Sequence, residues 1–96
     1  MSFFKNKNIL VTGGTGFVGS HLVEELVNQK ANIITTHLEL DPKSYFFTQK
    51  LNDKTIMVNC DVEDYELVFD IISKFNIEYI FHLAAQALVD EIYIRY

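Results

Sequence analysis

The sequence predicts an α/β fold, the first half of a doubly wound parallel sheet of about four strands with helices on both faces. Two observations lead to this prediction. Short β-branched runs alternate with stretches of helical periodicity, and all four glycines lie between Gly13 and Gly19, directly after the first such run. Parallel strands need right-handed crossovers, so the expected strand order is 3-2-1-4. We expect residues 1–96 to form one partial domain.

Short apolar or β-branched runs predict four strands, at residues 8–11, 32–36, 55–60 and 79–83. Apolar residues spaced three and four apart predict helices, over residues 17–29 and 61–75, with a shorter one over residues 43–51. The pattern weakens after Ala85, although residues 87–96 could begin another helix. The fourth strand would therefore have an open edge where a fifth normally lies.

The expected helix faces follow from the same spacing. In the first helix, Val18, Leu22 and Leu26 share a face that Val23 and Val27 widen. The short middle helix has three consecutive aromatic residues as anchors, Tyr45, Phe46 and Phe47. The last helix has apolar residues at core spacing, namely Leu67, Val68, Ile71, Ile72 and Phe75. Its first turn is acidic, which suits the helix dipole, and the acidic residues are Glu63, Asp64 and Glu66.

The composition indicates a small globular domain. Hydrophobic residues make up 49% of the chain, too large a share for a disordered protein. The net charge of −5 gives no electrostatic reason to expect nucleic acid or an anionic membrane as a partner. Cys60 is the only cysteine and no apolar run approaches ~20 residues, so we expect a cytoplasmic protein without disulfides or a membrane span.

The glycine-rich turn predicts a nucleotide site. A pyrophosphate needs exposed backbone N–H groups at a helix N-terminus, and side chains in the turn would block its approach. Two spacings fit, Gly13-x-x-Gly16-x-x-Gly19 and Gly14-x-Gly16-x-x-Gly19, and the pattern does not separate them. The strand before and the helix after favour a dinucleotide site over a plain turn. Without a Gly-Lys-Ser/Thr ending, the turn is not a P-loop.

Residues 12–22, TGGTGFVGSHL, resemble the opening of the extended short-chain dehydrogenases, the family of NAD(P)-dependent sugar-nucleotide epimerases and dehydratases. The resemblance extends over residues 7 to about 89, and residues 90–96 depart from it. It implies an NAD(P)-binding Rossmann fold. It also implies that the glycine turn and the helix start hold the cofactor, through Gly13, Thr15, Gly16, Phe17, Val18 and Gly19.

Two later segments carry the same resemblance. Residues 59–62, NCDV, are similar to the end of the family's third strand, which implies that Asp61 meets the adenine amino group and Val62 the ring. The segment FHLAAQ is similar to the family's fourth strand, which implies contacts on the ribose and nicotinamide side from Leu83, Ala84, Ala85 and Gln86. Residues 40–47 and 83–89 look most like the dehydratase branch, the CDP-glucose and GDP-mannose 4,6-dehydratases.

The end of the second strand bears on the choice of cofactor. An acid there normally binds the adenosine ribose of NAD, whereas a nearby Arg favours the 2′-phosphate of NADP. His37 stands at the position of the acid, and Leu38 at the position of the Arg. Glu39 is close enough to substitute as the ribose acceptor. The sequence leaves NAD and NADP open, and the lack of a cation favours NAD.

Other polar residues have simpler explanations. We expect His82 to be a hydrogen-bonded packing residue, His21 to be structural, and Cys60 to be a small buried apolar group. Asp61, at the end of a parallel strand, fits a ligand contact and can also cap the next helix. No spacing of His, Asp or Glu makes a convincing metal site.

The catalytic pair of the short-chain dehydrogenases is missing. That pair is Tyr-x-x-x-Lys, in which the Lys lowers the tyrosine pKa, and no tyrosine here has Lys four positions later. We therefore expect the NAD(P)-binding portion of a dehydratase or epimerase, truncated or split from its catalytic half. It would bind the dinucleotide and either a complementary C-terminal chain or a second copy. The alternatives are a non-catalytic dinucleotide-binding or regulatory module and a poorly folded remnant.

Overall fold

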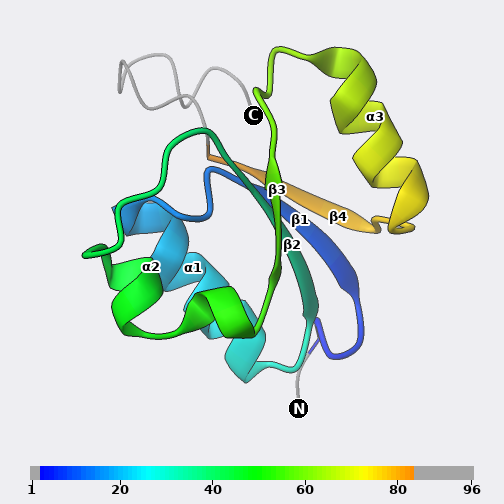
Figure 1. The fold of residues 1–96 in the computed structure, drawn as a ribbon. Coiled ribbons are helices and arrows are strands. Elements are labelled where there is room, and N and C mark those ends of the chain that lie inside the picture. The colour runs from blue at the N-terminus through cyan, green and yellow to red at the C-terminus, as the bar shows by residue number, and fades with distance from the viewer. Residues whose placement is uncertain (1–2, 84–96) are drawn as a thin grey trace.

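A computed structural model describes residues 3–83 as a parallel sheet with helices on both faces (Figure 1). The strands are β1 (Asn8–Thr12), β2 (Asn32–His37), β3 (Ile56–Asn59) and β4 (Tyr79–His82). The helices are α1 (Phe17–Asn28), α2 (Tyr45–Thr48), the 3₁₀ turn η1 (Leu51–Asp53) and α3 (Tyr65–Lys74). The sheet order is β3-β2-β1-β4 and every pairing is parallel, which confirms the predicted topology.

Strand β1 lies at the centre and divides the core into two layers. Its side chains alternate between the faces, so Ile9 and Val11 point toward α1 and α2, whereas Leu10 points toward α3. All three are completely buried. On the α3 side, Leu10 packs with Ile34 and Ile71. Figure 1 shows α1 and α2 on one side of the sheet and α3 on the other, as expected for a doubly wound fold.

The buried face of α1 differs from the predicted one. Val18 is 71% exposed, and the residues of the helix that are buried are Gly19, Ser20, Val23 and Leu26. Two small residues in the first turn let the helix start approach the turn after β1 closely, which rotates Val18 outward. The prediction that Val18 belongs to the core is therefore wrong, while Leu22 and Val27 do pack against the core.

Helix α3 begins later than the periodicity indicates. Residues 61–64 form a turn, in which an Asp61 carboxylate oxygen accepts a hydrogen bond from the Glu63 N–H (2.9 Å). Asp64 caps the helix instead, accepting from the Leu67 N–H at 3.2 Å. Asp side chains favour such turn and cap positions over the helix interior. The capping role expected for Asp61 is thus performed by Asp64, three residues further on.

The aromatic run after β2 forms only one turn of helix. Phe46 is completely buried in the core beneath α1, and Phe47 packs against the same cluster. Lys50 then adopts a left-handed conformation (φ 58°), which ends the predicted 43–51 helix early and leads into η1. Two of the three expected anchors therefore reach the core, and Tyr45 lies on the surface of α1 instead.

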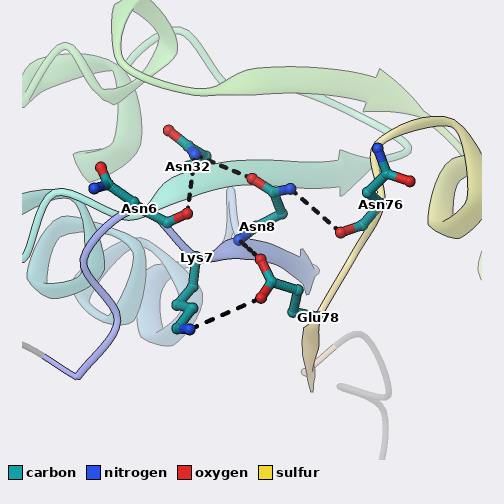
Figure 2. Close-up of polar contacts among 6 residues, drawn as sticks. All are labelled: Asn6, Lys7, Asn8, Asn32, Asn76 and Glu78. Atoms are coloured by element: carbon teal, nitrogen blue, oxygen red, sulfur yellow. Dashed lines mark hydrogen bonds and ion pairs between the residues drawn. The ribbon is translucent and has the colours of Figure 1, made fainter.

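A polar network ties the strands together at their amino ends, as Figure 2 shows. Asn8 is at its centre: its side-chain oxygen accepts from Asn32 Nδ2 (3.0 Å) and its side-chain amide donates to the Asn76 carbonyl (3.3 Å). Its backbone N–H donates to the Glu78 carboxylate at 3.0 Å. One residue of β1 thus fixes the starts of both neighbouring strands, β2 and β4.

Strand β4 forms one edge of the sheet. Among residues 3–83 it pairs with β1 alone. Ile80, on the α3 face, is 50% exposed, while on the other face the Phe4 ring packs edge-on against Tyr79 and Phe81. None of the helices in this part of the chain has the length and hydropathy needed to cross a membrane.

The amino-edge network predicts a stability effect. Asn8→Ala removes both side-chain hydrogen bonds of Asn8 and is expected to lower the free energy of unfolding by about 1 kcal/mol. Urea denaturation followed by circular dichroism measures the change. Asn28→Ala, at the exposed end of α1, is the matched control and should stay within about 0.5 kcal/mol of the parent. Equal effects of the two substitutions would show that the network does not stabilise the sheet.

Candidate dinucleotide-binding site

The turn between β1 and α1 depends on glycine at several positions, each for a different reason. Gly13 has a φ of 72°, in the left-handed region that only glycine adopts readily. Its carbonyl accepts a hydrogen bond from the Gly16 N–H at 3.2 Å, which closes the turn. A Cβ at Gly14 would strike the Thr35 hydroxyl and lie 3.0 Å from a Val23 methyl group. The side chains of Thr35 and Val23 therefore pack directly against the backbone of the turn at Gly14.

Gly19 and Gly16 differ in the space that is available for a side chain. A Cβ at Gly19 would collide with the Gly13 carbonyl oxygen and lie 2.8 Å from the Gly14 Cα, so this glycine lets the helix pack on the turn. A Cβ at Gly16 would meet only the Gly13 oxygen, at an ordinary 3.5 Å. Gly16 is exposed, and nothing within the described chain requires a glycine there. The left-handed Gly13 favours the Gly13-x-x-Gly16-x-x-Gly19 spacing over the one that begins at Gly14.

The N-terminus of α1 keeps its backbone donors available. Gly16 is the N-cap, no side chain of the described residues caps the helix, and no acidic residue lies in its first turn. The first N–H groups of a helix have no partner inside it, and together with the helix dipole they attract an anion. Helix α3 begins at the same edge of the sheet with a cap from Asp64 and an acid, Glu66, in its first turn. Of these two helices, α1 is the one without a side-chain cap or a first-turn acid among the described residues.

Threonines at the strand ends hold the turn in place. The buried Thr36 hydroxyl accepts from the Gly13 N–H at 3.3 Å and joins the turn to β2. The Thr12 hydroxyl lies 2.8 Å from His82 Nδ1 and accepts from the Leu83 N–H at 3.0 Å, joining β1 to β4. His82 is hydrogen-bonded as expected, although its side chain is exposed rather than packed. Neither threonine is among the residues predicted from the sequence, and the signal for both is a β-branched hydroxyl residue within the last two positions of a strand.

The end of β2 presents His37. Its backbone carbonyl accepts from the Cys60 N–H at 3.0 Å, which brings the segment that leads to Asp61 beside it. Its ring nitrogen Nδ1 is shielded from solvent and has no hydrogen-bond partner among the described residues. Leu38 and Glu39, in the bend that follows, are both exposed. The strand end thus offers one unsatisfied ring nitrogen, one apolar side chain and one carboxylate.

The residues predicted to bind the cofactor follow the carboxyl ends of the four strands. Such ends share one edge of a parallel sheet, and ligands of doubly wound folds bind there. Thr15 and the glycines lie in the turn, and Phe17 and Val18 are exposed in the first turn of α1. Asp61 is exposed and Val62 half-buried in the loop after β3, and Leu83 directly follows β4. Ala84, Ala85 and Gln86 lie outside the described residues.

An aromatic group flanks this edge on the outer surface of α1 and α2. The His21 ring stacks on Tyr45 with centroids 4.2 Å apart, and Phe17 meets the His21 ring edge-on at 4.8 Å. The Tyr45 hydroxyl donates to a Glu24 carboxylate oxygen at 2.6 Å. That hydrogen bond raises the pKa of the Tyr45 phenol above its ordinary value, and desolvation raises it further. These contacts attach α2 to α1 and support the structural role expected for His21.

Cys60 is buried beside the α3 core and behaves as a small apolar residue, as expected. Burial raises the pKa of its thiol, and the negative charges of Asp64 and Asp61 raise the pKa further. A thiol with a raised pKa is a poor nucleophile at neutral pH. Among residues 3–83, no group of three or more His, Cys, Asp or Glu side chains gathers to hold a metal ion.

Two shallow hollows lie elsewhere on the described surface. One, of about 320 Å³, lies at the amino ends of β2 and β3 and is lined by residues such as Asn32, Asp53 and Ile56. The other, of about 270 Å³, lies between α3 and β3. Neither has a glycine turn or an uncapped helix N-terminus beside it. The glycine turn and the uncapped start of α1 lie instead at the carboxyl edge of the sheet.

Fold and turn together define the class of the protein, a Rossmann-type α/β protein with a glycine-rich turn between its first strand and first helix. Residues 9–93 match the family model described as the NAD dependent epimerase/dehydratase family. The chain belongs to this family.

Its relatives come from both branches of that family. The CDP-glucose 4,6-dehydratase of Salmonella typhimurium is 36% identical over 92% of this chain and 25% of its own length. The UDP-glucose 4-epimerase structure of Thermotoga maritima is 40% identical with a TM-score of 0.67, covering 88% of this chain and 26% of that one. The dTDP-glucose 4,6-dehydratase of Bacillus anthracis, solved in complex with NAD, is 27% identical with a TM-score of 0.71, covering 84% and 27%.

The relatives agree with the resemblance to 4,6-dehydratases, and 4-epimerases match to a similar extent. The chain spans about a quarter of the length of the curated relatives that it matches first. The family is therefore established for the described fold, whereas the substrates belong to relatives that are much longer.

The glycine geometry predicts opposite effects on stability at two positions. Gly19→Ala should lower the melting temperature by about 10 °C or more, because its Cβ collides with the backbone of the turn. Gly16→Ala should leave the free energy of unfolding within about 1 kcal/mol, because its φ of −73° and its surroundings accept a methyl group. Thermal denaturation compares the two variants directly. A similar loss at both positions would contradict the separate roles assigned to them.

The Tyr45 contact predicts a change in alkaline titration. The neutral phenol is favoured in the folded state, so its contribution to stability is complete below the ordinary tyrosine pKa and is lost as the pH rises through the raised pKa. Glu24→Gln removes the neighbouring charge and should shift the Tyr45 titration to lower pH. The measurement is the tyrosinate absorbance near 295 nm, with Tyr45→Phe used to isolate the Tyr45 signal. An unchanged titration in Glu24→Gln would refute the contact.

Proposed function

We propose that these residues bind NAD as the cofactor-binding portion of a sugar-nucleotide epimerase or dehydratase. One observation carries the proposal: the uncapped N-terminus of α1, with Gly16 exposed in front of it and no acid in its first turn. An anion is the ligand that this arrangement favours, and a dinucleotide pyrophosphate is the anion that strand-turn-helix units of this kind hold. Family membership supports the choice of NAD.

The other predicted residues fit the rest of a dinucleotide. We assign the pyrophosphate to the backbone of Gly13, Thr15, Gly16 and the first turn of α1, and the adenine to Asp61 and Val62. The end of β2, with His37 and Glu39, would meet the adenosine ribose. Leu83 and the three residues after it would extend toward the nicotinamide. This assignment follows the order in which neighbouring strands of a doubly wound sheet present their carboxyl ends.

NAD is favoured over NADP by the absence of positive charge near the ribose position. There is no Lys or Arg between residues 31 and 42. The exposed side chains that follow His37 are apolar or acidic, and a 2′-phosphate needs a cation. The solved dTDP-glucose 4,6-dehydratase, a relative, also holds NAD. A cytoplasmic location is part of the proposal, since the single cysteine forms no disulfide.

The chemistry of the cofactor defines what these residues contribute. Bound NAD would accept a hydride from a sugar carbon, and the described residues would bind and orient it. Proton transfer needs a group such as Tyr-x-x-x-Lys, which is not found in residues 1–96. We therefore propose that sugar-nucleotide turnover belongs to a longer protein or to an assembly with a complementary chain. The missing pair also favours a second candidate, a dinucleotide-binding module without catalysis.

Dinucleotide binding tests the proposal. Calorimetric titration of the 96-residue chain with NAD should give saturable 1:1 binding, and Gly16→Ala should raise the Kd by about tenfold or more because its methyl group occupies the phosphate approach. Ala31→Gly, far from the turn, is a control of similar size change.

The two candidate functions give different results when the C-terminal part of a relative is added. Restored turnover of a nucleotide sugar supports an enzyme portion, and tight binding of NAD by a monomer without any turnover supports a module. Absence of binding under both conditions would refute NAD binding. Hydrogen exchange measured on the same sample separates that result from a chain that does not fold, because a folded core protects its backbone amides.

A further inference from the structure

We propose that two copies of this chain associate through β3, whose free edge pairs with the β3 strand of the second copy around a two-fold axis. The two sheets then join into one, and the two α3 helices lie along the same seam. The inference goes beyond the proposed function, because it concerns the edge of the sheet at β3 and not the glycine turn.

Strand β3 is the edge of the sheet opposite β4 (Figure 1). Within residues 3–83 it pairs with β2 alone. The Cys60 N–H, directly after the strand, donates to the His37 carbonyl of β2. Because backbone groups alternate in direction along a strand, those of Met57 and Asn59 point away from β2. The edge therefore presents hydrogen-bonding groups to an extended strand of another chain.

The edge also carries apolar surface on the α3 face of the sheet. Val58 packs against the core on that side. Ile56, two residues earlier and thus on the same face, is 49% exposed. The hollow of about 270 Å³ between α3 and β3 continues this surface, with Val58 on one wall and Leu67, Ile71 and Phe75 on the other. Covering Ile56 and the hollow removes apolar surface from water, which favours association.

Two opposite charges beside the hollow select the partner. Asp70 and Lys74 line it one helical turn apart. Neither makes an ion pair within the part of the chain that the structure describes, and the Lys74 ammonium lies 5.5 Å from the centre of the Phe75 ring. A two-fold interface must be complementary to itself, since the same patch meets its own copy. One acid and one base on the same patch satisfy this condition, whereas a patch of one sign would repel its copy.

The direction of α3 brings the opposite charges together. The helix runs antiparallel to the strands, from its cap at Asp64 on the carboxyl edge to Asn76, which contacts Asn8 on the amino edge. A two-fold axis beside β3 therefore sets the two α3 helices antiparallel to each other. Asp70 of each copy then faces Lys74 of the other, so the seam contains the same ion pair twice.

The strand pairing has one register that suits these contacts. With Met57 on the two-fold axis, its outward backbone groups bond to the same groups of the other copy. Ile56 of each copy then lies opposite Val58 of the other on the α3 face. Such apolar cross-strand pairs are what stabilises neighbouring strands of a sheet. The exposed Ile56 thereby becomes part of a continuous apolar layer beneath the two helices.

The first test compares the two edges of the sheet. Ile56 on β3 and Ile80 on β4 are 49% and 50% exposed on the same face, so each serves as the matched control for the other. Sedimentation of the Ile80→Lys chain, in which association through β4 is suppressed, should still give a dimer at about 100 µM. Adding Ile56→Lys should raise the Kd of that dimer by about tenfold or more, because lysine on an edge strand opposes pairing.

The second test exchanges the charges of α3. Asp70→Lys and Lys74→Asp should each raise the dimer Kd by about fivefold, because each sets like charges against one another across the seam. The two substitutions combined should return the Kd to within about threefold of the parent chain, since the pairs are restored in reverse. Glu25→Lys makes the same change of charge on α1, on the other face of the sheet, and is the control.

Hydrogen exchange locates the interface. The Met57 and Asn59 amides should exchange more slowly as the protein concentration rises, and melting temperatures show that every variant remains folded. A monomeric Ile80→Lys chain would overturn the inference, as would a dimer that Ile56→Lys leaves intact or one in which the Met57 and Asn59 amides are not protected. Separate titration of the same samples with NAD reports on the proposed function, which any of these outcomes leaves in place.

Discussion

The contact of Gly19 with the Gly13–Gly14 backbone is the constraint on which the rest of the structure depends. It sets the distance between the start of α1 and the end of β1, because no side chain fits between them. With that distance fixed, Val23 and Leu26 reach the core above β1. The same helix start has no side-chain cap among the described residues, and Gly16 is exposed in front of it. Core packing and the uncapped helix start thus meet at one close approach.

The sheet keeps this geometry by polar contacts at both of its ends. At the amino edge, Asn8 joins β1 to β2 and β4. At the carboxyl edge, Thr36 and Thr12 do the same with hydroxyl groups. The middle of β1 is purely apolar, and its hydrophobic contacts stabilise the sheet without fixing the register of the strands. Polar side chains at the strand ends therefore define the register, and the register decides which residues meet a ligand.

Much of this arrangement follows from sequence patterns, and the exceptions have physical causes. Strand order and the glycine turn depend on local periodicity and on backbone freedom, which a sequence displays directly. Helical spacing predicts Val18 in the core, and it lies outside because spacing does not reveal how closely a helix approaches its strand. The late start of α3 arose because Asp61 and Asp64 compete with the helix for backbone N–H groups. The unpartnered nitrogen of His37 depends on tertiary contacts that no local pattern contains.

Within residues 3–83, one edge of β4 has no strand beside it, and this has a consequence for the chain at high concentration. The unpaired backbone N–H and C=O groups of an edge strand can form hydrogen bonds with an extended segment of another chain. Tyr79–His82 contains neither proline nor lysine, the residues that discourage such pairing. With Ile80 half-exposed beside it, the edge makes aggregation compete with correct assembly. Overproduction of this chain is therefore expected to yield inclusion bodies before it yields more folded protein.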